Sequence, residues 1–325
     1  MQYYLGLAHE QFRPDDLLEQ AIAGERAGFD GLECSDHFQP WWDSGESGHA
    51  WIWLGAAAQA TEQVPVGPAV TAALQRYHPA LIAQGFATLE VMYPGRVFVG
   101  IGSGESLNES PVGAHWPDGD GQLAALEEAL QLIRRLWAGE VVDHDGRFFR
   151  TKQARLWTRP ETPPPLYVSA FHPGSAALAG RYGDGIWTLA DPESTPELLD
   201  AYRGACDDAD RDPGEIVLQA QFSWARSDEE ALESCRVWKG AVPPEYYVDD
   251  WHDPRALYEH AEQKVSDEEF KQKAIISTDP NHHVERIREI EKLGATIVAL
   301  MNISGADPLA AIGVYGEDVL PKLSG

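Results

Sequence analysis

The sequence predicts an α/β protein built as a (β/α)8 TIM barrel with insertion segments. Eight short β-type runs alternate with longer helical patterns along the 325 residues, which is the count of such a barrel. No repeat, low-complexity linker or second core interrupts this alternation, and α/β barrels of this length are routinely one domain. The alternative is an open doubly wound sheet, which we favour less because eight consecutive units close more easily.

The eight strands are predicted from short apolar runs of β type. Each run is followed by a helical pattern, so all eight are expected to be parallel and to end at one face of the barrel. In chain order the runs are Tyr3–Ala8, Leu32–Ser35, Val64–Ala72, Arg96–Gly102, Leu166–Ala170, Gly185–Leu189, Glu215–Ala225 and Thr296–Ile303.

The helices are predicted from longer amphipathic patterns and from their start signals. Pro14–Ala27 carries acidic residues in its first turn, where they favour the helix dipole. Pro79 is suitably placed near the start of the helix predicted at His78–Tyr93. The other helices are expected at His49–Thr61, Gln122–Trp137, Gly174–Arg181 and Thr195–Ala209, and two more begin at Asp228 and at Asp307.

Two segments depart from the simple alternation. Val141–Phe149 contains Asp145-Gly146, a dipeptide typical of a β-hairpin turn. The stretch from 242 to 276 is too long for a simple connection, so we expect a helical insertion there before the last β/α unit. The whole chain, 1–325, is expected to form a single domain.

The composition excludes several classes of protein. Acidic residues outnumber basic ones by 52 to 25, which gives a formal charge of −27, and 43% of residues are apolar. Such acidity excludes nonspecific binding of nucleic acid and disfavours binding to anionic membranes. The acid-rich, lysine-poor balance is typical of a salt-rich cytoplasm, where a Debye length of ~3 Å at molar salt screens self-repulsion. An ordinary acidic cytosolic enzyme is the alternative.

The cysteines and the N-terminus indicate a cytoplasmic protein. Cys34, Cys206 and Cys235 are odd in number and form no CxxC pair, which argues against disulfides or a zinc site. The first residues lack the pattern of a signal peptide, and no apolar run approaches the ~18 residues of a membrane span. The sequence also lacks HExxH and paired histidines at metal spacing, so we expect no metal.

The barrel fold selects candidate functional residues without any motif, because active sites lie where the strands end. One histidine and two carboxylates converge there, which suits proton transfer. GIGSGE, at Gly100–Glu105, lacks the third glycine of a nucleotide-binding motif, and its glycines more plausibly let backbone approach a flat ring. The strand-end residues are His9, Glu10, Asp36, His37, Trp41, Trp42, Ala69, Val70, Thr71, Gly102, Gly104, Glu105, Asn108, Glu109, Ser169–Gly174, Met301 and Asn302.

Two further patterns allow more than one interpretation. SAFHPGS, at 169–175, places backbone N–H groups at a helix start, where they can bind an anion or be capped by Ser175. The tryptophans Trp41, Trp42, Trp51 and Trp53 could be core, but their polar surroundings favour a pocket wall.

The strings SDHFQPW (Ser35–Trp41), EQF (Glu10–Phe12) and GSGESLNE (Gly102–Glu109) resemble one family. They are similar to the coenzyme F420-dependent glucose-6-phosphate dehydrogenases, a branch of the luciferase-like barrel superfamily. The similarity runs to about residue 190 and returns weakly near Ser277–Pro280. The resemblance implies a homodimer that acts on CH–OH donors and transfers a hydride between an alcohol or sugar carbon and C5 of F420.

The resemblance also implies roles for single residues. His37 would remove the proton of the substrate hydroxyl, Glu105 would supply a proton to the N1 side of the ring, Trp41 would flank the reacting centre, and Glu10 would orient His37 or bind substrate. Ala69-Val70 matches the position of a non-prolyl cis peptide that supports the bent ring. The residues implied in cofactor binding are Asp36, Ala69, Val70, Thr71, Gly104, Asn108, Ser169, Ala170 and Gly174.

The substrate stays open, because the family's phosphate-binding lysine after the sixth strand has no counterpart in Thr188–Ser194. A phosphate needs charge-assisted donors, and the insertion offers Arg255 and Lys264 as candidates. A sugar phosphate, a free sugar and another alcohol or carbonyl compound all remain. The functional alternatives are an F420- or FMN-dependent reductase or monooxygenase acting on another carbonyl or alkene, and a barrel that binds a small molecule without catalysis.

Overall fold

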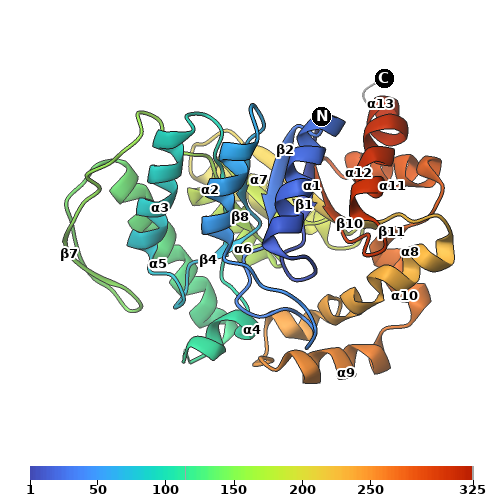
Figure 1. Cartoon of the computed structure of the whole chain (residues 1–325). Helices are drawn as coiled ribbons and strands as arrows, with labels where there is room; N and C mark the ends of the chain where they lie inside the picture. Colours follow the sequence, from blue (N-terminus) through green and yellow to red (C-terminus); the bar gives the residue numbers. More distant parts are fainter. Residues whose placement is uncertain (114, 324–325) are drawn as a thin grey trace.

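The computed structural model describes residues 1–113 and 115–323 and has the predicted parallel β/α barrel, with helices around a central ring of strands (Figure 1). The predicted strands are confirmed, with shorter bounds in most cases. They are β1 (Gln2–Leu7), β2 (Gly31–Cys34), β3 (Val66–Pro68), β4 (Thr71–Ala72), β5 (Val99–Gly102), β8 (Leu166–Ser169), β9 (Gly185–Leu189), β10 (Glu215–Ser223) and β12 (Ile297–Asn302).

The strands close into a ring. Hydrogen bonding connects them in the order β3-β2-β1-β12-β10-β9-β8-β5-β4, with parallel neighbours throughout. A bridge between Val66 and Val97 joins β3 to the segment before β5. β3 and β4 are the two halves of the third predicted strand, which is interrupted at a cis peptide between Ala69 and Val70.

Helices cover the outside of the ring (Figure 1). The chain also forms a helix that the sequence analysis omitted, α11, although Asp279 caps it and Pro280 occupies its first position. The bounds are α1 (Pro14–Ala27), α2 (Ala50–Ala60), α3 (Pro79–Met92), α4 (Ser106–Glu109), α5 (Gly119–Trp137), α6 (Pro173–Tyr182), α7 (Thr195–Asp208), α8 (Asp228–Cys235), α11 (Pro280–Lys292), α12 (Pro308–Val314) and α13 (Leu320–Leu323).

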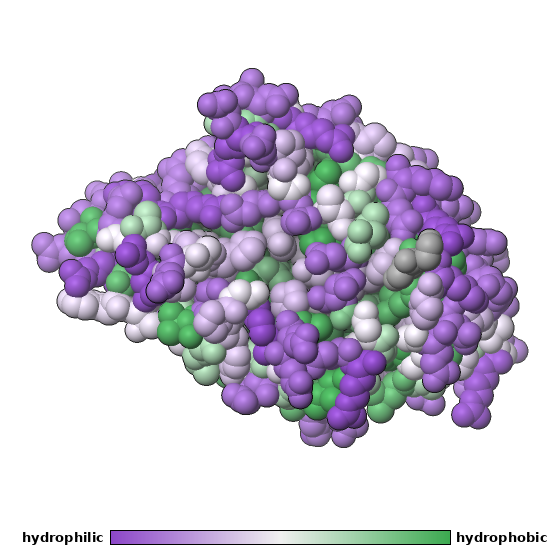
Figure 2. All heavy atoms as spheres, turned by 90° about the horizontal axis from the view of Figure 1, so that it is seen from above, coloured by the Kyte–Doolittle hydropathy of each residue, from purple (hydrophilic) through white to green (hydrophobic). Residues whose placement is uncertain are grey.

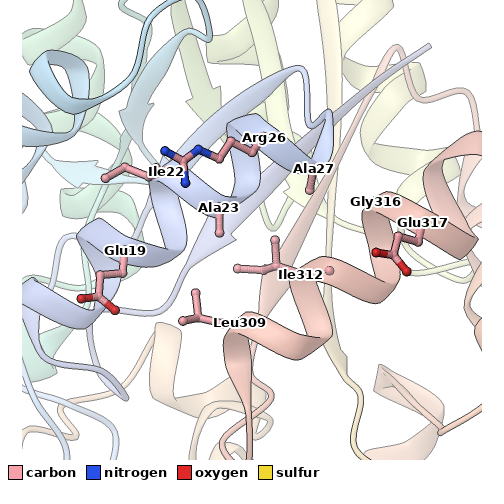
Figure 3. Close-up of a pocket in the computed structure, with 10 residues that line it drawn as sticks. Glu19, Ile22, Ala23, Arg26, Ala27, Leu309, Ile312, Gly316 and Glu317 are labelled. Atoms are coloured by element: carbon pink, nitrogen blue, oxygen red, sulfur yellow. The ribbon is translucent and has the colours of Figure 1, made fainter.

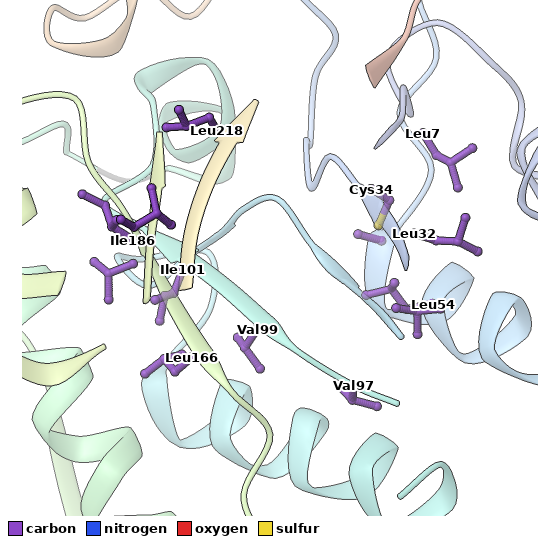
Figure 4. Packing of buried hydrophobic residues seen from close by; sticks show 14 of the residues in the cluster. Leu7, Leu32, Cys34, Leu54, Val97, Val99, Ile101, Leu166, Ile186 and Leu218 are labelled. Carbon is purple, nitrogen blue, oxygen red and sulfur yellow. The ribbon is translucent and has the colours of Figure 1, made fainter. Parts of the chain in front are cut away.

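The alternation of side chains along each strand separates two cores. On β1, Leu5 and Leu7 belong to the large apolar layer between strands and helices, part of which Figure 4 shows around Leu32, Val99 and Leu166. Tyr4, on the opposite face of β1, packs inside the ring with other aromatic residues. The register pairs Leu7 with Cys34 and Asn302, so neighbouring strands end at one level and form the barrel mouth.

The two departures from the alternation fold as follows. A hairpin of β6 (Val142–Asp145) and β7 (Arg150–Ala154) projects from the barrel beside α3 and α5 (Figure 1). The span from 242 to 276 contains a 3-10 turn at Pro244–Tyr247, followed by α9 (Pro254–Lys264), α10 (Asp267–Lys273) and the short strand β11 (Ala274–Ile276), which pairs with β10.

The face shown in Figure 2 is predominantly hydrophilic, as expected from the charge, with apolar areas between polar side chains. Within 1–113 and 115–323, no helix is both long enough and apolar enough to cross a membrane.

Candidate active site

His37 and Glu10 meet at the mouth of the barrel. His37 follows β2 and Glu10 follows β1, and these neighbouring parallel strands bring His37 Nε2 to 3.4 Å from Glu10 Oε1. Both side chains are largely buried, with 11% and 2% of their surfaces exposed. A carboxylate this close can stabilise the positive charge that an imidazole gains on accepting a proton, so the pair is suited to proton transfer.

Hydrogen bonds orient the His37 ring. Nδ1 lies 3.1 Å from the Gln39 carbonyl oxygen and 3.3 Å from Asn108 Nδ2. The tautomer with its proton on Nδ1 donates to the carbonyl, whereas the tautomer with its proton on Nε2 faces the Glu10 carboxylate and can accept from Asn108. In the first tautomer, Nε2 is the nitrogen that can accept a proton, and it lies beside Glu10. The ring therefore presents its basic nitrogen beside a carboxylate that can stabilise the imidazolium.

Glu10 is itself held in place by β2. The Ser35 hydroxyl donates to Glu10 Oε2 over 2.5 Å and accepts the backbone N–H of His9 over 3.1 Å. One carboxylate oxygen thus binds Ser35 while the other faces His37. Ser35 was not among the predicted site residues. Its position at the end of β2, two residues before His37, could have indicated it.

Asn108 connects the histidine to the second carboxylate of the mouth. Its Oδ1 accepts from the backbone N–H groups of Phe38 and Gln39, at 2.8 and 3.3 Å. Its Nδ2 donates to Glu105 Oε2 over 2.9 Å and lies 3.3 Å from His37 Nδ1. A single buried amide therefore fixes the loop after β2 and the carboxylate after β5 relative to each other.

Asp36 lies in a buried polar cluster on the other side of the mouth. Thr71 donates to Asp36 Oδ2 over 2.7 Å, and Trp51 Nε1 donates to the Thr71 hydroxyl over 2.9 Å. Arg76 Nη1 lies 3.2 Å from Asp36 Oδ1, while Nη2 donates to the Asp36 carbonyl oxygen over 2.6 Å. Arg76 was not among the predicted site residues, because its place in the loop after β4 carries no pattern of its own.

Glu109 completes this cluster. Its Oε2 accepts the backbone N–H groups of Gln75 and Arg76, at 3.0 and 2.7 Å, and its Oε1 lies 3.7 Å from Arg76 Nε. Burial raises the pKa of Glu109 above its ordinary value, and the nearby Glu105 carboxylate adds to the shift.

Aromatic side chains line the opening next to His37. The centroid of the Trp41 ring lies 5.2 Å from that of His37 and 5.5 Å from that of Tyr247. The centroids of the Tyr247 and Phe171 rings are 5.2 Å apart. Burial raises the pKa of the Tyr247 phenol, with contributions from Glu105 and Glu10, so Tyr247 stays protonated. Tyr247 comes from the insertion and was missed, because its distance along the chain from the other mouth residues hides the contact.

Trp42 and Trp53 belong to the core, the alternative considered for the tryptophans, rather than to a pocket wall. Trp42 packs edge-on against Trp238, and Trp53 belongs to the outer core and donates to the Pro14 carbonyl. Trp51 stacks on Tyr77 at 4.2 Å between ring centroids. Of the four, Trp41 packs against His37, whereas Trp51 reaches the Asp36 cluster through its hydrogen bond to Thr71.

The remaining predicted residues lie where neighbouring strand ends pack closely against each other. A Cβ on Gly100 would come within 2.2 Å of the Pro68 carbonyl, and one on Gly102 within 2.9 Å of Val70 Cγ2 and 3.3 Å of Ser169 Cβ. The interrupted strand at Ala69-Val70 therefore packs directly on β5. Gly104 adopts φ +81°, a left-handed conformation that favours glycine.

The Ser169–Gly174 segment leads into α6. Ala170 N donates to the Trp187 carbonyl, and His172 and Ser175 form a reciprocal capping box at the helix start. Capping, one of the two alternatives weighed for this segment, is therefore present. Gly174 lies in the first turn of α6. The atoms nearest to a Cβ added there belong to Leu123 and His172 rather than to the residues around His37.

The cations proposed for phosphate binding are paired with carboxylates. Arg255 binds Asp43 over 3.0 Å, and Lys264 binds Glu245. Lys273, which the sequence analysis did not consider, donates to Asp191 over 2.8 Å. The fold thus brings Lys273 next to the stretch that follows β9, but this lysine already forms an ion pair with Asp191.

A groove on the outer surface is separate from this site. It lies between α1 and α12 and is lined by side chains such as Ile22, Arg26, Leu309 and Glu317 (Figure 3). In the described ranges, no cluster of three or more His, Cys, Asp or Glu residues has the geometry to hold a metal ion.

Comparisons with known proteins identify the family. The model of the family described as luciferase-like monooxygenase matches residues 4–296. An F420-dependent glucose-6-phosphate dehydrogenase from Microbacterium testaceum (strain StLB037) is 38% identical over 320 residues, covering 97% of this chain and 95% of the relative. An F420-dependent hydroxymycolic acid dehydrogenase from Mycobacterium tuberculosis (strain ATCC 25618 / H37Rv) is 37% identical over 322 residues, covering 98% and 87%.

The solved structure of an F420-dependent secondary alcohol dehydrogenase in complex with an F420–acetone adduct is also similar, with a TM-score of 0.93 and 35% identity over 99% of this chain and 98% of that one. The chain belongs to the luciferase-like family, within the branch of the F420-dependent dehydrogenases.

Proposed function

We propose that the protein is an F420-dependent dehydrogenase that transfers a hydride between an alcohol carbon and the cofactor. The observation that carries this proposal is the connected set His37–Glu10, Asn108 and Glu105 at one barrel mouth. Alcohol oxidation releases a hydride and a proton, so it needs a base beside the hydroxyl and a proton source beside the cofactor. The names of the relatives point to the same reaction class.

The residues at the mouth fit the flat ring of the cofactor. Gly100 and Gly102 place no side chain on one face of β5, where an added Cβ would meet Pro68, Val70 and Ser169. Bound F420 would supply a deazaflavin that accepts or returns a hydride at C5. We assign its binding to Asp36, Ala69, Val70, Thr71, Gly104, Asn108, Ser169, Ala170 and Gly174.

His37 is the proposed base. With its proton on Nδ1, Nε2 can take the hydroxyl proton as the hydride leaves the carbon, and the charge that forms on the ring lies 3.4 Å from Glu10. In the reverse direction the imidazolium returns the proton to the carbonyl oxygen. Trp41 flanks this position and excludes water from it.

Glu105 is the proposed proton donor to the N1 side of the ring. Its Oε2 accepts from Asn108, which leaves Oε1 available to carry a proton. Because Asn108 also binds the loop after β2, the acid and the base keep a fixed separation during turnover.

We propose an uncharged secondary alcohol as the substrate, rather than a sugar phosphate. Trp41, Tyr247 and Phe171 offer apolar surface beside His37, whereas Arg255, Lys264 and Lys273 are each paired with a carboxylate. A phosphate would have to displace one of these partners and would approach the carboxyl groups of Glu10 and Glu105. Glucose 6-phosphate is the second candidate, supported by the names of several relatives.

A substrate panel tests this function. Oxidised F420 is mixed with simple secondary alcohols, free glucose and glucose 6-phosphate at low and high salt, and the loss of its visible absorbance is followed. We expect reduction by secondary alcohols, and its loss in His37→Ala and Glu105→Gln. Turnover that survives in both variants would contradict the mechanism. Binding of FMN with oxygen consumption, or binding of F420 without any turnover, would favour the rival functions.

We further propose a single-domain, cytoplasmic homodimer from a salt-rich cell. The helices α2 and α3 adjoin, with the Tyr93 hydroxyl donating to the Gly55 carbonyl, and they expose Ile52, Leu81 and Met92 by 75%, 54% and 57%. Such an apolar face suits a second copy of the chain. Light scattering should give a dimer for the wild type and a monomer for Ile52→Glu, and stability should rise with salt.

A further inference from the structure

Arg76 is the cation of the buried cluster beside the proposed cofactor site. Its side chain is 7% exposed, and it faces two carboxylates, those of Asp36 and Glu109, which are 1% and 0% exposed. Its guanidinium also lies over the Tyr77 ring, 4.7 Å from the centroid. The mechanism proposed above assigns no role to Arg76. Burying a guanidinium costs free energy unless ion pairs and hydrogen bonds compensate for the lost hydration.

Arg76 and its two carboxylate partners come from three different strand ends. Asp36 follows β2, Arg76 itself lies in the loop after β4, and Glu109 ends the short helix after β5. Without Arg76, the two carboxylates would lack their common counter-ion.

Each of these contacts adjoins a residue assigned to the cofactor. Asp36 accepts from the Thr71 hydroxyl, and Glu109 lies against Gly104, where an added Cβ would come within 3.4 Å of Glu109 Cγ. Glu109 also accepts the backbone N–H of Arg76 itself, so the loop is bound at both its side chain and its backbone. Displacing Arg76 would therefore disturb Asp36, Thr71 and Gly104 together.

We propose that Arg76 is a positioning residue for cofactor binding, one that locks the strand ends of β2, β4 and β5 into a single rigid wall for the deazaflavin. This inference rests on the proposed function. Arginine suits the task because its planar fork contacts a carboxylate and a carbonyl at once, which the ammonium of lysine cannot reproduce.

The test is an equilibrium titration of F420 fluorescence with the wild type, Arg76→Met, Arg76→Lys and the control Arg134→Met. Arg134 also binds one carboxylate and one backbone carbonyl, those of Asp184 and Tyr182, but at the amino-terminal entrance of β9. Thermal melts identify the temperature at which every variant is folded, and the titrations are made there.

We expect Arg76→Met to weaken F420 binding at least tenfold, Arg76→Lys to restore part of the affinity, and Arg134→Met to bind like the wild type. At saturating F420, the KM for the alcohol should stay within twofold of the wild type in Arg76→Lys. If Arg76→Met does not fold, Arg76→Lys alone should bind more weakly. Folded Arg76 variants that bind F420 within twofold of the wild type would overturn the inference, whereas a wild type that fails to bind F420 would instead overturn the proposed function.

Discussion

Replacing Glu10 by glutamine tests the electrostatic part of the proposed mechanism. The substitution keeps the size of the side chain and its contact with Ser35, but it removes the negative charge that lies 3.4 Å from His37 Nε2. At an effective dielectric constant of ~20, unit charges at this separation attract by about 5 kcal/mol, which is an upper limit. Hydrogen bonds to charged groups contribute ~1.5–3 kcal/mol, so we expect kcat/KM to fall by about 10- to 100-fold.

The assay is the initial rate of F420 reduction by the most reactive alcohol at saturating cofactor. Glu128→Gln is the matched control, because Glu128 forms a comparable carboxylate–histidine contact with His144 Nε2 at 2.9 Å, outside the mouth. We expect that control to retain its rate within about twofold. A Glu10→Gln enzyme that is folded and equally fast would refute the claim that Glu10 stabilises charge on His37.

Three further predictions concern stability. Burial lowers the pKa of His283 to about 4, so below the ordinary pKa of 6.5 the unfolded chain binds a proton that the folded chain does not. The free energy of unfolding, measured by denaturant titration, should therefore fall by ~3 kcal/mol between pH 7 and pH 4, and by less in His283→Gln. Gly6→Ala should destabilise by ~1–3 kcal/mol, because its Cβ would come within 2.6 Å of the Met301 backbone, whereas Gly204→Ala, in open space on α7, should stabilise by ~0.5–1 kcal/mol. Among the described residues Glu33 has no hydrogen-bond partner, and burial raises its pKa well above the ordinary value, so unfolding at neutral pH releases its proton. Glu33→Gln should therefore raise stability more at pH 8 than at pH 4, and the opposite trend would contradict this.

Local patterns were sufficient to predict the barrel. Alternating strand and helix signals located the barrel strands, and the rule that sites lie at strand ends selected His37, Glu10 and Glu105 before any contact was known. The boundary of the third strand could not be predicted from periodicity, because its interruption at Ala69-Val70 is a backbone conformation rather than a hydrophobic pattern.

The residues that were missed share a physical reason. Ser35, Arg76 and Tyr247 act through contacts between different strand ends or with the insertion, and one sequence contains no signal for such pairings. The same reason explains Lys273, which the fold brings to Asp191. Trp42 and Trp53 were wrongly placed because polar neighbours in the sequence do not determine which way a side chain faces.

The central claim is direct hydride transfer from an alcohol carbon to F420 at the His37 mouth. It is tested most directly by a single turnover with an alcohol deuterated at the carbinol carbon, followed by mass spectrometry of the reduced cofactor. The account predicts that reduced F420 carries the deuterium, that the rate shows a primary isotope effect, and that His37→Ala abolishes the transfer. Reduced F420 without the label, or with hydrogen taken from solvent, would contradict it.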